Sequence, residues 1–265
     1  MKSDTTVRYK GTLTFDGTDF SGFQFQKNGR TVQGEFEKTL QKINHNQFIR
    51  IHPAGRTDAG VHAAEMVIHF DYPTTIQTDG LFKALNVLLP ADISVVAIEQ
   101  VDPEFHARYH AIAKTYTYRV DNQTIRNPFN RRYVLHHPYK LDLEKAQKAL
   151  GEIKGTHDFT SFCSAKTVIE DKVRTIYEAK VEVDPVTNEW LFTFTGDGFL
   201  YNMIRIIVGT VLSIADGRLE PSVMKEALDA KDRAAAGMTI AATGLRLERV
   251  FYDESEVADY IKNLK

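Results

Sequence analysis

The sequence contains a single cysteine, Cys163, in 265 residues. One thiol cannot form a disulfide within the chain, and it cannot provide the paired thiolates of a zinc site or a CxxC redox motif. A sequence with so little cysteine suits a reducing compartment, so we expect a cytoplasmic protein.

Long apolar runs are lacking as well. The longest, at 203–215, is too short to span a bilayer, and it contains Arg205. The first ten residues, MKSDTTVRYK, have no apolar region of the kind that a signal peptide needs, so secretion is not expected. The sequence also has no GxxxxGK[ST] loop and no GxGxxG fingerprint, the motifs that hold nucleotide phosphates.

The net charge of −2 gives no general case for nucleic-acid binding. Charge is nevertheless concentrated in one stretch, 105–140, which has seven Lys or Arg residues and one acid, Asp121. Histidines and aromatic residues are interleaved with these cations, a composition typical of a surface that contacts RNA phosphates and stacks on bases. The alternative is a solvated strand face whose charge is balanced by acids elsewhere, such as those in 251–260.

Alternating and helical apolar patterns predict an α+β fold. Each half of the chain mixes strands with a pair of helices, which favours two α/β sandwich halves that share a largely antiparallel sheet, with helices on one side and an active-site cleft between them. The expected strands are 7–15, 65–72, 93–101, 107–120, 173–184, 189–197 and 244–253, and the expected helices are 31–43, 78–90, 141–151, 198–215 and one from 221. The weakest boundary signal, near 102–105, divides the chain into 1–104 and 105–265.

The stretch HPAGRTDAGVHA, 52–63, places a cation and a carboxylate two residues apart between glycines. Gly55 and Gly60 permit unusual backbone angles and the close approach of another group. Arg56, Thr57 and Asp58 lie between them. One interpretation is a tight turn capped by the side chain of Asp58, and the other is a reactive loop.

Arg205 lies in a segment that is apolar nearly all round, which predicts a buried helix. A buried guanidinium needs a carboxylate partner or a wet cavity, because leaving it unpaired costs several kcal/mol, roughly. One interpretation is an ordinary internal ion pair. The sharper hypothesis is that the partner is Asp58. Such a pair would keep Asp58 ionised, because a nearby cation lowers the pKa of a carboxylate.

Six blocks resemble the tRNA pseudouridine synthase A (TruA) family in the expected order. The stretch AGRTDAGVHA is similar to the signature loop of that family, whose aspartate is catalytic. The blocks are 14–26, 54–63, 105–120, 155–163, 199–210 and 244–253. The sequence departs from the family at Thr243, where relatives usually carry proline before the Gly-Leu pair.

The resemblance implies isomerisation of uridine to pseudouridine in the anticodon stem-loop of tRNA, around positions 38 to 40. It also implies a homodimer that needs no cofactor or metal, because the reaction is redox-neutral and no group leaves. Asp58 would be the catalytic residue, acting at the ribose C1′, at the uracil C6 or by removing a ribose proton.

The resemblance assigns further residues to the substrate. Tyr116 matches the tyrosine that contacts the uracil, although Tyr118 lies on the same strand face and could be confused with it. Arg56 would occupy the space left by a flipped base, and Arg205 would orient Asp58. The basic side chains that would contact the RNA backbone are Arg126, Arg131 and Arg132.

Two rival functions can be stated. A metal-dependent hydrolase could use His52, Asp58 and His62, but their spacing matches no standard metal site. A non-catalytic RNA-binding module would keep the basic and aromatic stretch without any need for a cation that orients Asp58.

Overall fold

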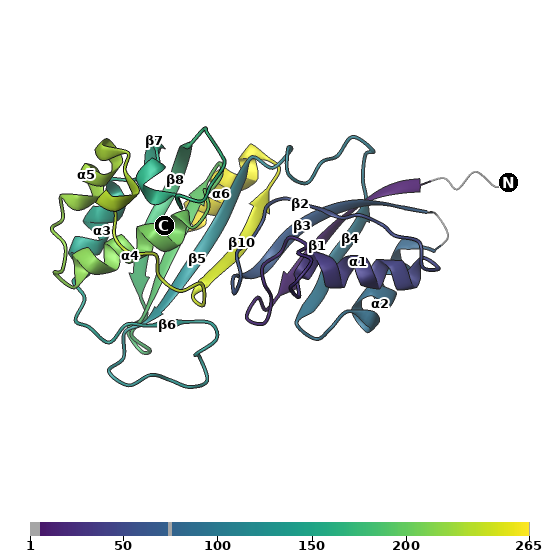
Figure 1. Cartoon of the computed structure of the whole chain (residues 1–265), viewed down its shortest axis with the longest axis horizontal. Coiled ribbons are helices and arrows are strands. Elements are labelled where there is room, and N and C mark those ends of the chain that lie inside the picture. Colours follow the sequence, from purple (N-terminus) through teal and green to yellow (C-terminus); the bar gives the residue numbers. More distant parts are fainter. Residues whose placement is uncertain (1–5, 74–75, 265) are drawn as a thin grey trace. The chain divides into compact units, whose positions relative to one another are not determined.

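The computed structural model describes residues 6–73 and 76–264. Part of MKSDTTVRYK, on which the expectation about secretion rests, lies outside these ranges. The chain forms two compact units (Figure 1). The first unit consists of 1–112 and 247–254, and the second of 113–246 and 255–265.

The first unit is built on antiparallel strands. Strand β1 pairs with β3 on one side and with β4 on the other, and the order of strands is β4-β1-β3-β10, with β2 on β3. The elements are β1 (Thr6–Phe15), α1 (Val32–Ile43), β2 (His52–Pro53), β3 (His62–Pro73), α2 (Thr78–Leu88), β4 (Ile93–Gln100) and β10 (Leu245–Phe251), the last of which belongs to this unit from Leu247.

One face of this sheet carries the core of the first unit. Met66, Ile68 and Phe70 alternate along β3, and all three are almost fully buried. Phe36 of α1 packs edge-on against Phe70, and α1 lies beside α2 (Figure 1). Helix α1 begins where predicted, because the side chain of Thr31 accepts a hydrogen bond from the backbone N–H of Gly34 at 3.1 Å.

The second unit contains antiparallel strands in the order β5-β9-β8-β7, with β6 parallel to β5. Its central helix is α4, whose side chains are buried except at one position. The elements are β5 (Ala113–Asp121), β6 (Leu135–His136), α3 (Leu143–Gly151), β7 (Gly155–Asp158), β8 (Val173–Val183), β9 (Glu189–Gly196), α4 (Met203–Ala215), α5 (Val223–Ala230) and α6 (Glu254–Asn263), with single 3₁₀ turns at Thr160–Phe162 and Arg233–Ala235.

The predicted α+β class with a largely antiparallel sheet is confirmed. The division at residue 104 stays a prediction about domains. Within the described residues, no helix has the length and apolar character needed to cross a membrane.

The structure differs from the expected elements at three places. The strand expected at 107–120 begins only at Ala113, because 106–110 forms a turn in which the His106 ring accepts the backbone N–H groups of Arg108 and Tyr109. The segment 155–166, where the sequence favours a loop, contains β7 and a 3₁₀ turn. Helix α6 was not predicted, although Val257, Tyr260, Ile261 and Leu264 recur at helical spacing, and none of its side chains is fully buried.

Candidate active-site residues

Asp58 lies in the loop between β2 and β3. The loop leaves the sheet at Ala54, whose backbone N–H donates to Val67 at 2.8 Å. It turns at Asp58, whose backbone carbonyl accepts the N–H of Val61 at 3.2 Å, and Gly60 has a φ of +80°. The tight turn that the Asp-Ala-Gly sequence favours is therefore present in the backbone.

The opening segment, 14–26, packs against this loop and forms backbone hydrogen bonds with it. The backbone N–H of Phe23 donates to the carbonyl of Thr57 at 3.0 Å, and that of Gly60 donates to Phe20 at 3.3 Å. Gly22 has a φ of +101°, and a Cβ there would lie 2.9 Å from the carbonyl oxygen of Thr57. The segments 14–26 and 54–63, which are distant in sequence, thus pack together around Asp58.

The side chains of the loop differ in exposure. Arg56 is exposed and Asp58 is half-buried, whereas Thr57 is only 7% exposed. The hydroxyl of Thr57 has no hydrogen-bond partner among the described residues. Exposure to solvent therefore increases from Thr57 through Asp58 to Arg56.

The histidines of the metal-site alternative have other contacts. The ring Nδ1 of His62 accepts the backbone N–H of Gly17 at 3.1 Å and lies 3.1 Å from a carboxylate oxygen of Asp16. The His52 ring stacks on that of His69, with centroids 4.9 Å apart. No group of three or more metal-ligating side chains occurs in the described parts of the chain.

Tyr116 and Tyr118 lie on β5 in the second unit and have different surroundings. The hydroxyl of Tyr118 donates to the carbonyl of Ala241 at 2.6 Å, and burial raises the pKa of Tyr118 far above its usual value. Tyr116 is 8% exposed, and its ring packs edge-on against Phe199 at 5.3 Å. The hydroxyl of Tyr118 is thus held by a backbone carbonyl, and the assignment of Tyr116 to the substrate stays a prediction.

Arg205 lies in the first turn of α4. The expected helix start near 198 was wrong, because Asn202 adopts a left-handed conformation with φ of 64° and α4 begins at Met203. Arg205 is half-buried. Its Nε donates to the carbonyl of Ile240 at 2.8 Å and its Nη1 to the amide oxygen of Asn202 at 2.7 Å. Two neutral oxygens therefore fix the direction of the guanidinium.

Residues around Arg205 that sequence reasoning missed include Asn202 and Gly209. A Cβ on Gly209 would lie 2.1 Å from the carbonyl oxygen of Met238, so only glycine allows the segment 237–241 to cross α4 this closely. The backbone N–H of Gly237 donates to the Thr210 hydroxyl at 2.9 Å. Both missed residues fall in the block 199–210, which was the signal that could have found them.

The candidate backbone-binding arginines lie on the connection between β5 and β6. Arg126, Arg131 and Arg132 are all exposed there. Asp58 and Arg56 belong to the first unit, and Tyr116 and Arg205 to the second. The pairing of Asp58 with Arg205 therefore stays a prediction.

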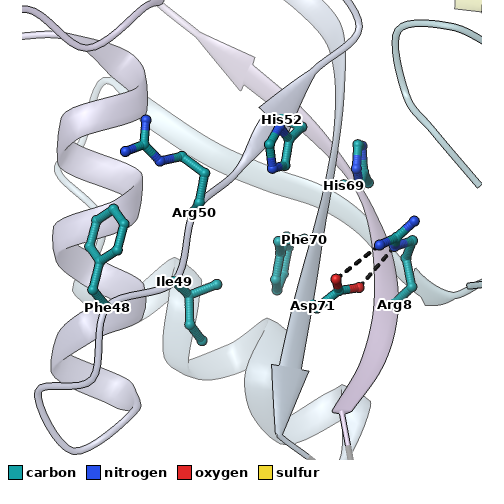
Figure 2. A pocket seen from close by; sticks show the side chains of 8 residues that line it. All are labelled: Arg8, Phe48, Ile49, Arg50, His52, His69, Phe70 and Asp71. Carbon is teal, nitrogen blue, oxygen red and sulfur yellow. Dashed lines mark hydrogen bonds and ion pairs between the residues drawn. The ribbon is translucent and has the colours of Figure 1, made fainter.

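A cavity of about 260 Å³ lies on the first unit and does not include Asp58 (Figure 2). His52 and His69 line it from paired positions on β2 and β3, and Arg8 and Asp71 form a two-point ion pair on its wall (Figure 2). His69 is 3% exposed, and burial, followed by the charges of His106 and His52, lowers its pKa to about 4. His69 is accordingly neutral near pH 7.

A family model described as tRNA pseudouridine synthase matches residues 13–110 and 149–253. These ranges cover most of the chain, so the chain belongs to the tRNA pseudouridine synthase family and is an isomerase. The matched ranges include Arg56, Asp58 and Arg205, whereas Tyr116 and the arginines of the β5–β6 connection fall between them.

The relatives support the same assignment along nearly the whole chain. The chain is 49% identical to tRNA pseudouridine synthase A of Latilactobacillus sakei, with 93% of this chain and 99% of the relative covered. It is 51% identical to tRNA pseudouridine synthase A of Lacticaseibacillus casei, with 93% and 100% covered. The enzyme of Geobacillus kaustophilus with the same name is 50% identical, with 94% and 96% covered. The non-catalytic alternative is set aside, because the chain is an enzyme of this family.

The packing of Gly22 on the Asp58 loop predicts the effect of a methyl group there. Gly22→Ala should lower the free energy of unfolding by about 1–3 kcal/mol, because the positive φ is strained for alanine and Thr57 is in the way. The rate of pseudouridine formation should fall as the loop shifts. Gly151→Ala is the matched control, since a Cβ there meets nothing within 4 Å. Unchanged stability and rate in the Gly22 variant would contradict this account of the loop.

The lowered pKa of His69 predicts a dependence of stability on pH. Below pH 6.5 the unfolded chain protonates this histidine while the folded chain resists protonation down to about pH 4. The free energy of unfolding should therefore fall as the pH drops from 6.5 to 4. In His69→Asn this fall should be shallower, as measured by urea unfolding across the range, and in the exposed control His45→Gln it should be unchanged. Equal slopes in all three proteins would refute the prediction.

Proposed function

We propose that this isomerase converts uridine to pseudouridine in the anticodon stem-loop of tRNA, around positions 38 to 40, with Asp58 as the reactive group. The observation that carries the proposal is the loop of Asp58 itself. Its backbone is fixed by hydrogen bonds to Phe20 and Phe23, while the carboxylate is half-buried and the neighbouring Arg56 is exposed. A partly exposed carboxylate on a loop whose backbone is fixed is suited to nucleophilic or base chemistry.

The reaction moves one bond and one proton. The bond between N1 of uracil and C1′ of ribose breaks, the base turns, a bond forms between C5 and C1′, and the proton lost from C5 is balanced by one gained at N1. Asp58 can bond to C1′ as N1 leaves and be displaced by C5, it can add to C6, or it can remove a ribose proton. Each route begins from the ionised carboxylate, and none changes the oxidation level, so no cofactor is needed.

The substrate base has to leave its stack before a carboxylate can reach it, at a cost of roughly a few kcal/mol. Arg56 is exposed and only two residues from Asp58, so it can occupy the space that the base leaves or hold the opposite strand. Tyr116, whose ring is fixed by Phe199, would stack on the flipped uracil.

Arg205 would pair with the carboxylate of Asp58. A cation in the first turn of a helix lies at the positive end of the helix dipole, where an anion is favoured. The bonds to Ile240 and Asn202 fix the direction of the guanidinium. A carboxylate held there would remain ionised.

We also propose that Arg126, Arg131 and Arg132 contact phosphates of the tRNA, that the enzyme is a homodimer and that it acts in the cytoplasm. Phosphate contacts position an RNA without reading its sequence, so these arginines would affect affinity more than the choice of uridine. Light scattering of the purified enzyme tests the dimer.

Removing the carboxylate should abolish the reaction. Asp58→Ala and Asp58→Asn should release no tritium above background from tRNA labelled at C5 of uridine, while tRNA binding largely survives. Asp79→Asn, an exposed acid on α2, is the control and should keep full activity. Mapping of pseudouridine in the treated tRNA identifies the modified positions. Turnover that persists without Asp58 would end the catalytic assignment.

Removing the cation should impair turnover without unfolding the protein. Arg205→Leu should lower kcat by about 100- to 1000-fold, the usual range for loss of a charge-stabilising donor. Arg205→Lys should recover part of the rate, because it keeps the charge. On acidification, the leucine variant should lose activity at a higher pH than the wild type does. A variant of normal activity, or one that only unfolds, would indicate an ordinary structural arginine instead.

A further inference from the structure

The connection between β5 and β6, residues 122–134, forms a wide loop that extends from its sheet (Figure 1). The ends of this loop are held firmly. Asn122 donates through its side-chain amide to the carbonyls of His137 at 2.7 Å and Tyr139 at 2.8 Å. Near the other end, the amide of Asn130 donates to a carboxylate oxygen of Glu189 at 3.0 Å.

Between these ends the loop exposes apolar side chains. Phe129 is 88% exposed and Ile125 is 83% exposed. The position of Phe129 is nevertheless defined, because its backbone N–H donates to the side-chain oxygen of Asn127 at 3.0 Å and the guanidinium of Arg131 donates to the carbonyl of Pro128 at 3.0 Å. A phenyl ring held out in solvent by an ordered turn is available for contact with another molecule.

The charge of the loop indicates what that molecule is. Residues 122–134 contain three arginines and no acid, and all three arginines are exposed. Two copies of the loop would repel one another, whereas RNA offers phosphates for the arginines and the face of a base for the ring. Only an unpaired nucleotide presents that face, since paired bases are covered by their neighbours.

We propose that Phe129 stacks on an unpaired base of the tRNA while Arg126 and Arg131 contact the flanking phosphates. This inference rests on the proposed action on tRNA and adds to it a contact that phosphate binding does not require. It assigns the β5–β6 connection to a single-stranded part of the substrate, and it makes the ring, not only the charge, a source of affinity.

Replacement of the ring tests the proposal. Phe129→Ala should weaken tRNA binding about 5- to 100-fold, the range for loss of one stacked base, and Phe129→Leu should weaken it similarly, because leucine keeps the apolar character without the flat face. Phe129→Trp should bind like the wild type. The dependence of affinity on salt should be unchanged in all three variants, whereas Arg131→Ala should reduce its slope by about one.

Two further measurements complete the experiment. The side chain is mostly exposed, so thermal unfolding should be the same in every Phe129 variant, and the KM for tRNA should rise in Phe129→Ala in parallel with the dissociation constant. Wild-type affinity in Phe129→Ala, in an enzyme that still modifies tRNA, would overturn the stacking contact and leave the proposed function intact. Retained binding by the leucine variant, or dissociation of a dimer by the alanine variant, would show a protein contact and also overturn it. Failure of the wild type to modify tRNA would refute the proposed function and the stacking contact with it.

Discussion

The packing of the segment 14–26 against the loop of Asp58 is the constraint on which the proposed chemistry depends. A free carboxylate on a surface loop samples many directions, and a reactive one has to be aimed. Here the backbone of the loop is fixed by hydrogen bonds from Phe23 and Gly60 and by the close approach that Gly22 permits. The residue proposed to react is thus carried on a loop that main-chain contacts hold in place.

In the second unit, hydrogen bonds likewise fix the direction of the Arg205 guanidinium. Arg205 is aimed by the carbonyl of Ile240 and the amide of Asn202, and the segment that carries Ile240 lies against α4 only because Gly209 has no side chain. Tyr118 donates to the neighbouring carbonyl of Ala241. Thr243, where the sequence departs from the family pattern, follows this segment by two residues.

The charge distribution fits an enzyme that recognises RNA locally. The net charge is close to zero, yet the β5–β6 connection carries three exposed arginines and a largely exposed phenyl ring. The cavity around His52 and His69 is different in kind, because its arginines, Arg8 and Arg50, pair with Asp71 and Glu37 and its buried histidine is neutral near pH 7. Abundant basic residues therefore do not by themselves mark an RNA surface.

The sequence by itself determined the α+β class, the family, and most helices and strands, because apolar periodicity and the Thr31 cap are local properties. It also singled out Asp58 and Arg205. Only the tertiary structure shows that a backbone carbonyl holds the Tyr118 hydroxyl, since that carbonyl lies 123 residues away. The structure also places Arg205 in the first turn of α4, not in the middle of the expected helix, because Asn202 is left-handed and the helix begins only at Met203. Such features depend on backbone groups brought together from distant segments, and a backbone carbonyl leaves no residue-specific trace in the sequence.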